Sequence, residues 1–508
     1  MSDRHESSEV NTKDIRDVRE QADRDAAAEL QTFGYRQQLK RSMGAFSSFA
    51  ISFSLISITT GIFANFGHGI RQAGPAVIWS WSIAVVGQLL VALVIADLAT
   101  RIPLSGYGYQ WASRLVSPHY GFFVGWLLTL QWLTGFPGIC KTLADYLHGF
   151  VHPDCTAGGH SVWLMIGIIS AIAVIHLLGI RLAALVNDVG VIAEIVGAAV
   201  VTLALLVLYG FSRPDGFAFL LDSTNYQTAQ PADFKAFAFS LLLGAWCLTG
   251  FEAAADLAEE THQPRSVVPR AIITSELASG IGGFLMLAAF VLAIGDLRSV
   301  QAIDDAPLLA IIQQRLGDWL TPAVMLVLFA SIFACGVASL AATTRLLFAL
   351  ARDNMLPGSG FLKQVHPVHQ TPRNVILLVW IVIILVVLGL SYFDQLNAIT
   401  SISAVTGYLG YGGIVVSALF APQSKSLEGG FSLGRLRVPI AIAAFAWTMG
   451  VVIALLIPNS GDAQTVSSQT TGIVTAGGIL AGVLLYALYT FSRIRAGTAG
   501  PPPAMSTN

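Results

Sequence analysis

The sequence predicts an all-α polytopic membrane protein with twelve transmembrane helices. The chain of 508 residues is 54% hydrophobic and only 11% charged, and its mean hydropathy is +0.67. In soluble domains about a quarter of all residues are charged. Crossing a bilayer takes roughly 20 apolar residues, and twelve runs approach that length. The runs are 43–67, 74–100, 119–149, 161–181, 184–210, 236–257, 269–296, 319–350, 374–392, 396–420, 438–457 and 471–492.

The composition excludes several classes of function. The net charge is −2, and Lys and Arg are scattered along the chain, which does not suit a nucleic-acid partner. The four cysteines lack the spacing of metal ligands. The sequence contains no nucleophile–base pair and no nucleotide-binding loop. We therefore expect no enzyme activity, no cofactor and no metal site, with the lipid bilayer as a partner and the oligomeric state left open.

The distribution of Lys and Arg predicts the orientation in the membrane. An even number of crossings places both tails, 1–40 and 494–508, on one side. If that side is the cytoplasm, 22 of the 28 Lys and Arg residues fall on inner segments and the other six on the outer side. This bias is typical of cytoplasmic segments. The N-terminal tail has no apolar stretch and is not a signal peptide. We expect a multi-pass protein of the plasma (inner) membrane with both termini cytoplasmic.

Two of the twelve runs are interrupted by small and polar residues. The first run contains ISITTGIF, which places Ser57, Thr59, Thr60 and Gly61 where Ile, Leu or Val would cost less. The sixth run reads FSLLLGAWCLTGFEAAADLAEET. With the tails inside, these two runs cross in opposite directions. Corresponding broken helices of opposite orientation indicate an inverted-repeat transporter. The alternative is that Ser, Thr and Gly only allow close helix packing.

This pairing divides the chain into units. The first repeat covers 41–210 and the second 236–420, and two further runs follow within 437–493. Unwound backbone is tolerated at membrane depth where it lines a polar cavity or is buried in protein. We therefore expect the two breaks to meet at a binding site.

The backbone at the first break suits a zwitterionic substrate, which carries a negative and a positive group. Amide groups at the start of the outer half-helix, near Thr60, Gly61 and Ile62, attract a carboxylate. Carbonyl groups at the other half-helix ends attract an ammonium group. Gly61 and Gly250 would let a ligand approach the backbone closely. The break residues expected to bind substrate are Ser57, Ile58, Thr59, Thr60, Gly61, Ile62 and Gly250.

Acidic residues inside apolar runs are the remaining candidates. Glu194, in NDVGVIAEIVGAAVVTLALL, costs several kcal/mol if charged, so by default it faces the interior and has a function. It could accept a proton or hold a sodium ion. The alternative is a protonated acid hydrogen-bonded between helices.

Acidic residues near the ends of runs have two interpretations. Glu252 and Asp256 lie one turn apart and could form a proton path or an inner gate. The alternative is that Asp256, Glu259 and Glu260 form a solvated helix end. Asp97 is expected to form a structural ion pair with Arg101. The segment DAPLLAIIQQRLGDW predicts an amphipathic helix on the outer surface.

Several stretches together resemble one superfamily of transporters. They are FGYRQQLKRSMGAFSSFAISFSLISITTGIF, ADLATRIPLSGYGYQWASRL, GFEAAADLAEETHQPRSVVPRAI and ATTRLLFALARDNMLP. From Phe33 to Arg495 the chain resembles the amino acid–polyamine–organocation (APC) superfamily, within it the amino-acid/choline transporter branch. The resemblance implies a LeuT-type five-plus-five inverted repeat with two extra C-terminal helices. It also implies secondary active transport of an amino acid or related amine.

The resemblance also implies roles for single residues. Thr59, Thr60 and Gly61 take the place of the small-residue carboxylate motif, although two threonines replace its usual GSG-like pattern. Trp246 matches an aromatic gate, and Glu252 matches an acidic position of the sixth span. The carbonyls of Cys247 and Thr249 would bind an amine. Glu194 falls where cationic-amino-acid relatives carry a lysine. The expected cavity lining includes Gln131, Trp246 and Phe333.

The sequence thus predicts a permease that imports an amino acid or related amine, coupled to H⁺ or Na⁺ by alternating access. One alternative is an uncoupled exchanger that uses the same site. Another is a transporter-like membrane receptor, which would be expected to carry longer cytosolic extensions. The expected gate or coupling residues are Trp246, Glu194 and Glu252. A zwitterion or amine of modest size is the expected substrate.

Overall fold

The computed structural model is built almost entirely of helices. It describes residues 28, 30–37, 41, 43–152, 158–210, 215–225, 230–303, 306–366, 371–421, 430–457 and 468–503, so most of the predicted N-terminal tail and the last residues of the C-terminal tail lie outside the described residues. Among the described residues, ten helices are long and apolar enough to cross a membrane. The first two predicted runs fall within one stretch of 57 residues, Ala45–Arg101, and the sixth is represented by the shorter Phe234–Cys247. The chain is therefore an all-α polytopic membrane protein.

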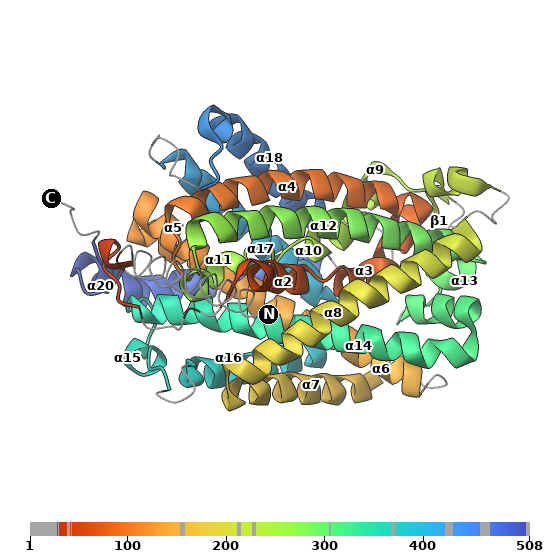
Figure 1. The fold of residues 1–508 in the computed structure, drawn as a ribbon, viewed down its shortest axis with the longest axis horizontal. Coiled ribbons are helices and arrows are strands. Elements are labelled where there is room, and N and C mark those ends of the chain that lie inside the picture. Colours follow the sequence, from red (N-terminus) through yellow and green to blue (C-terminus); the bar gives the residue numbers. More distant parts are fainter. Residues whose placement is uncertain are drawn as a thin grey trace, which may run out of the picture.

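The helices follow the predicted runs closely, and each element is labelled as in Figure 1. In the first half they are α2 (Ala45–Ile56), α3 (Ile58–Ala73), η1 (Gly74–Ala76), α4 (Val77–Arg101), α5 (Tyr107–Leu115), α6 (Pro118–Val151), α7 (Gly158–Leu178), α8 (Ile180–Leu205) and η2 (Leu206–Gly210). The middle of the chain adds η3 (Gly216–Leu221), β1 (Thr224–Asn225), β2 (Gln230–Pro231), α9 (Phe234–Ser240), α10 (Leu242–Cys247), α11 (Ala253–Asp256) and η4 (Ala258–Glu260).

The second half completes the bundle. Its elements are α12 (Pro264–Ala293), α13 (Leu297–Gln301), α14 (Pro307–Arg352), α15 (Ser359–Leu362), α16 (Arg373–Tyr392), η5 (Leu396–Ala398), α17 (Ile399–Leu419), η6 (Gly434–Leu436), α18 (Arg437–Leu456), α19 (Ser468–Leu485), η7 (Tyr486–Thr490) and α20 (Phe491–Arg495).

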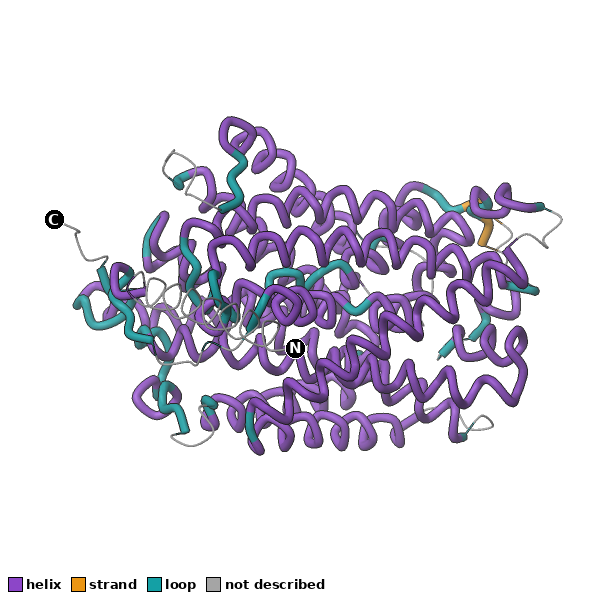
Figure 2. The backbone as a smooth tube through the Cα atoms, in the orientation of Figure 1, coloured by secondary structure: helices purple, strands orange, loops and turns teal. Residues whose placement is uncertain are grey.

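The long helices run between two ends of the molecule. The short helices α5, α15 and α20 lie at one end, which we call the tail end, and α9, α13 and β1 lie at the other, which we call the loop end (Figure 1). Figure 2 shows helix through the body of the molecule and loops mainly at these two ends. The short strands β1 and β2 pair antiparallel at the loop end.

Helices differ in how much of their surface is buried. The most apolar part of Leu396–Leu419 is 78% buried, whereas that of Ser468–Arg495 is 17% buried. The inner helices α4, α6, α12, α14 and α17 pack on one another. A helix that is apolar on its exposed face suits a lipid environment. The peripheral helices therefore cover a protein core that contains both interrupted runs.

The predicted amphipathic helix is present as the first part of α14. Pro307 occupies the first turn, where its missing N–H costs nothing. The helix bends at Gly317, whose φ of 76° is outside the helical region. Leu308, Ile311 and Ile312 are buried, so this helix packs its apolar face on the protein.

At the tail end, the segment 30–37 is held against the end of α14. Tyr35 Oη donates to Asp353 at 2.9 Å, and the same carboxylate accepts from Tyr109 Oη at 2.8 Å and from Gln110 Nε2 at 3.0 Å. Burial raises the pKa of Asp353, and burial next to that carboxylate raises the pKa of Tyr35. The backbone N–H of Gly500 donates to the carbonyl of Asp353 at 2.9 Å. The segment 30–37 and Gly500 thus both bind Asp353, the first at its carboxylate and the second at its backbone carbonyl.

Removing the Tyr35 hydroxyl is expected to destabilise this tail-end contact. Tyr35→Phe leaves a buried carboxylate with one donor fewer, a loss of about 1–3 kcal/mol for such a group. We expect a lower thermal unfolding temperature of the purified protein in detergent. Tyr392→Phe is the control, because Tyr392 is 84% exposed. Equal unfolding temperatures for the wild type and both variants would contradict this role of Tyr35.

Candidate substrate site between the two broken helices

The first run is broken at a single residue, Ser57. Its φ of 36° and ψ of 88° end α2 and begin α3 in a left-handed conformation. The serine then caps α3, because its Oγ accepts from Thr60 N at 3.2 Å and lies 2.7 Å from Thr60 Oγ1. Serine is a preferred residue at this position of a helix. A strained non-glycine residue of this kind typically marks a functional segment.

Two of the three amides expected to receive a carboxylate, those of Thr60 and Gly61, already have partners. Thr60 N donates to Ser57 Oγ, and Gly61 N donates to the carbonyl of Ser57 at 2.9 Å. The amide of Thr59 donates to Oε1 of Glu194 at 3.3 Å. A carboxylate is therefore bound at the start of α3 in this conformation, and it belongs to the protein itself.

The two glycines serve the crossing of the broken helices. A Cβ on Gly61 would lie 2.1 Å from Cys247 Sγ, and a Cβ on Gly250 would lie 2.8 Å from Leu55 Cγ. Gly250 also has a φ of 106°, which disfavours any other residue. Each glycine thus admits the other broken helix, as the packing alternative expected, and Cys247 lies against Gly61 in this conformation.

The second break spans the residues between α10 and α11. Leu248 O accepts from Gln88 Nε2 at 2.8 Å, and Phe251 O accepts from Ser52 Oγ at 2.8 Å. Thr249 Oγ1 donates to Trp246 O at 2.8 Å. Side chains of neighbouring helices therefore replace the hydrogen bonds that the interruption of the helix removes.

A small cavity lies where the two breaks meet. Its volume is about 20 Å³, which is room for about one water molecule. Of the predicted binding residues it is lined by Thr60, Trp246 and Thr249, and of the other predicted lining residues by Gln131. Ser57, Ile58, Thr59, Gly61, Ile62, Cys247 and Gly250 are buried or sit in the surrounding backbone without lining it.

Other lining residues were missed by the sequence analysis. Cys335 of α14 lines the cavity, whereas the expected Phe333 does not. Trp132 and Gly135 of α6 and Ser403 of α17 complete its wall together with Leu55, Ile56 and Ile139. The indole N–H of Trp132 is buried beside the hydroxyl of Tyr107. Trp132 thus gives the cavity wall a polar group that the sequence alone did not single out.

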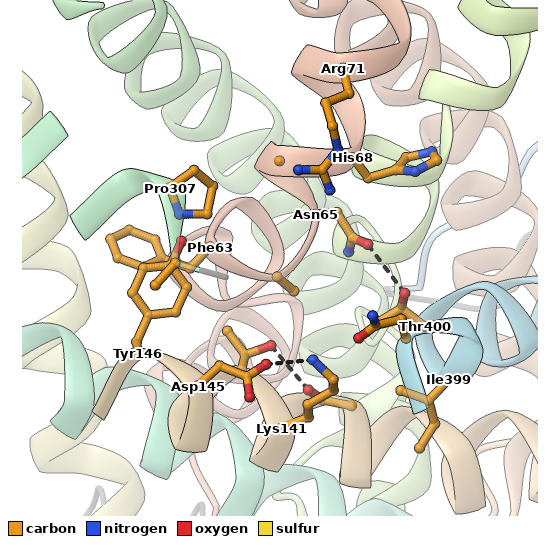
Figure 3. A pocket seen from close by; sticks show the side chains of 16 residues that line it. Phe63, Asn65, His68, Arg71, Lys141, Asp145, Tyr146, Pro307, Ile399 and Thr400 are labelled. Atoms are coloured by element: carbon orange, nitrogen blue, oxygen red, sulfur yellow. Dashed lines mark hydrogen bonds and ion pairs between the residues drawn. The ribbon is translucent and has the colours of Figure 1, made fainter. Parts of the chain in front are cut away.

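A second pocket of about 100 Å³ is lined by the end of α3, by α6 and by the start of α14, which lie toward the loop end. Figure 3 shows its lining. Lys141 and Asp145 form an ion pair on one face of α6 beside it. Thr400 Oγ1 donates to Asn65 Oδ1 at 3.2 Å, which joins α17 to α3 across the pocket. We call this the outer pocket. Its charged and polar lining suits a small polar molecule.

Trp246 separates the outer pocket from the central cavity. Its side chain lines the central cavity, and it is only 7% exposed. Gly138 lines the outer pocket, and a Cβ there would lie 3.3 Å from Cζ2 of Trp246. The indole thus lies at the boundary between the two spaces, where an aromatic gate is expected.

A third cavity lies toward the tail end. It has a volume of about 420 Å³ between α2, α8, η4 and α14. Ile51 lines this inner cavity, and Leu55, one turn later on α2, lines the central cavity. On α14, Ala338 lines the inner cavity and Cys335, one turn before it, lines the central cavity. Residues one turn apart on a helix are neighbours. The outer pocket, central cavity and inner cavity therefore follow one another along the broken helices.

Glu194 reaches the core as the sequence predicted. It is 2% exposed on α8, and Ser57 and Ser331 surround its carboxyl group in addition to Thr59. The hydroxyls of Thr59 and Ser331 are buried next to this carboxyl group. The helix dipole and amide of α3 favour a carboxylate at this point. Glu194 therefore connects α8 directly to the break of the first run.

The acidic residues after the second break are buried. Asp256, Glu259 and Glu260 are at most 5% exposed, so a solvated helix end is wrong. Glu259 pairs with Arg352 at 3.2 Å, and Glu260 pairs with Arg345 at 3.3 Å. These pairs tie the end of the interrupted run to α14. The predicted pair of Asp97 with Arg101 is confirmed at 2.9 Å.

Comparison with known proteins adds independent information. The model of a family described as amino acid permease matches residues 43–482. The amino-acid permease BAT1 of Arabidopsis thaliana is 25% identical over 91% of this chain and 94% of its own. The branched-chain amino acid permease BcaP of Bacillus subtilis is 27% identical over 66% of this chain and 72% of its own. A putative polyamine transporter of Candida albicans is 27% identical over 70% and 67%, respectively.

Proposed function

Because the chain belongs to the amino acid permease family, we propose that it is a secondary active transporter that carries an amino acid or related amine into the cell across the plasma membrane. The named relatives are transporters and not enzymes. The observation that carries the proposal is the order of the three cavities along the broken helices. A substrate moving from the loop end to the tail end would meet them in turn.

The central cavity is closed in this conformation. About 20 Å³ is too little for an amino acid, so binding requires the broken helices to separate from α6 and α14. Trp246 would close the outer side, and the contact of segment 30–37 with Asp353 would close the tail end. Opening these two sides in turn is alternating access.

The proposed topology has twelve crossings and cytoplasmic termini. It divides Ala45–Arg101 into two crossings and counts α9, α10 and α11 as one interrupted crossing. The inverted repeats would then cover 41–210 and 236–420, with the last pair within 437–493. Labelling of introduced cysteines with membrane-impermeant reagents in intact cells tests this: tail-end positions should be protected, and loop-end positions should react.

Substrate class is tested by uptake into proteoliposomes. The names of the relatives suggest branched-chain amino acids and polyamines as the first unlabelled competitors. We expect one class of zwitterion or amine to inhibit uptake of the labelled substrate. Accumulation against a gradient distinguishes a coupled permease from an uncoupled exchanger. Binding without any uptake or exchange would favour the receptor alternative and overturn the proposal.

Trp246 is expected to act as the outer gate. Trp246→Ala removes the boundary between the outer pocket and the central cavity, so the site can no longer be closed over its substrate. We expect a KM raised by about tenfold, which corresponds to about 1.4 kcal/mol, and faster leak of loaded substrate. Trp319→Ala is the control, because Trp319 is 83% exposed at the loop end. Unchanged kinetics with reduced expression would instead assign Trp246 to packing.

A further inference from the structure

Three buried carboxyl groups lie near the break of the sixth run without lining the central cavity. Glu252 begins α11, Asp256 ends it, and Glu276 lies near the middle of α12, which packs against α11. All three residues are 0% exposed. Glu276 was not recognised in the sequence, although it interrupts an apolar stretch.

These carboxyl groups are short of cationic partners. The side-chain oxygens of Glu276 have no hydrogen-bond partner among the described residues, and the carboxyl group of Asp256 lies beside the backbone N–H of Gly106. The electrostatic partner of Glu276 is another acid, Glu252. Asp256 interacts with Glu252 and with Arg345, which pairs with Glu260. An unpaired buried charge costs several kcal/mol. Neighbouring carboxylates also repel each other, so they cannot all be ionised.

Tyrosine hydroxyls surround the three acids. Tyr411 Oη donates to Oε1 of Glu252 at 2.7 Å. Tyr408 interacts electrostatically with Glu276, and Tyr107 interacts with Glu252 and Asp256. The Oη atoms of Tyr408 and Tyr107 are buried, the first beside Trp447 and the second beside Trp132. A phenol oxygen can accept from a protonated carboxyl group and can donate to an ionised one. This environment therefore accommodates both forms of the acids.

A side-chain path leads from these acids to the central cavity. Gln131 lines that cavity, and its Nε2 donates to Tyr411 Oη at 3.4 Å. The same hydroxyl donates to Glu252, so Glu252 is one phenol group away from the cavity wall. None of the three cavities described above is lined by Glu252, Asp256 or Glu276. A proton needs no cavity, whereas a metal ion with its ligands does.

We propose that Glu276 and Glu252 form a proton-binding pair that communicates with the substrate cavity through Tyr411. The proposal rests on the proposed function, because it adds a proton site to that transporter. The groups that interact with the pair are Tyr107, Cys247, Asp256, Tyr408 and Tyr411. Other titratable or charged groups on elements packed against α12 are His68, Arg71, Asp97, Arg101, Arg181, Asp188, Glu194, Tyr209, Glu259, Glu260, Arg315, Asp318, Cys335, Arg345 and Arg352.

Infrared difference spectroscopy of the purified full-length protein between low and high pH, without substrate, tests the site. A protonated carboxyl group has its own C=O band. We expect Glu276→Gln to remove one such pH-dependent band. Asp318→Asn, an exposed acid at the loop end, should leave that band in place. Retention of the complete band pattern in Glu276→Gln would overturn the proposal. A band that responds to sodium at fixed pH would assign a metal cation and would overturn it too.

A second variant covers the case in which Glu276→Gln does not fold. Tyr408→Phe keeps the acid and removes the hydroxyl beside it, so the same band should remain but change its frequency. An unchanged frequency would overturn the role of Glu276 beside Tyr408. These spectra require no transport, so they stand even if the wild type moves no amino acid, an outcome that would refute only the proposed function.

Discussion

Replacing Glu194 by glutamine is expected to abolish uphill accumulation of substrate while preserving its exchange across the membrane. The amide mimics the protonated acid, keeps the size of the side chain and still occupies the start of α3 beside Thr59. Transport driven by a pH gradient requires a proton to load and unload in step with the substrate. Without a titrating group at the break of the first run, the protein should still alternate but should not concentrate its substrate.

The measurement is uptake into proteoliposomes with a pH gradient, a sodium gradient or neither, with Asp318→Asn as an acid-to-amide control. Exchange is measured in vesicles preloaded with unlabelled substrate. If accumulation depends on sodium at fixed pH, the coupling ion is sodium and not the proton, since carboxylates bind hard cations well. Normal accumulation by Glu194→Gln under both gradients would leave Glu194 a packing residue, with Glu252 as the next candidate for coupling.

Gly61→Val is expected to prevent the two broken helices from crossing. Its Cβ would lie 2.1 Å from Cys247 Sγ and 2.8 Å from Cys247 Cα, so backbone as well as side chain would have to move. Overpacking of this kind typically costs 1–3 kcal/mol and sometimes more. We expect about 3 kcal/mol of destabilisation, loss of substrate binding and a lower unfolding temperature.

Gly450→Val is the matched control, because a Cβ on Gly450 of α18 meets nothing within 4 Å. Combining Gly61→Ala with Cys247→Gly should recover part of the stability that Gly61→Ala alone loses, because the double variant removes the closest atom. If Gly61→Val bound substrate and unfolded like the wild type, the close crossing of α3 and α10 would not exist in solution.

The sequence predicted the features that depend on local composition, which are the positions of the long helices and of the first break. Apolar runs located the long helices within a few residues, since lipid-facing and core-facing residues are both apolar. The polar patch around Ser57 located the break, and the expectation that an intramembrane acid faces inward was confirmed for Glu194. The assignment of a substrate to these residues stays a prediction.

The parts that depend on pairing between distant segments could not be read from the chain. Nothing in a single run tells that Gly61 admits Cys247, or that Trp132 and Ser403 share a cavity wall. The burial of Asp256 and Glu260 also depends on α5 and α14, which lie elsewhere in the sequence. Glu276 could have been found, because an acid within an apolar run is a functional candidate by default.

The interruption of the sixth run also bears on how the protein is made. Phe234–Cys247 is shorter than the roughly 20 residues that a helix needs to enter the bilayer alone, and the residues that follow it are unwound and acidic. The carbonyl groups of Leu248 and Phe251 in the interruption accept from Gln88 and Ser52, which are synthesised earlier. The acids that follow lie beside α12, which is synthesised later. This segment should therefore leave the translocon together with its neighbours, which makes its membrane insertion a step of assembly.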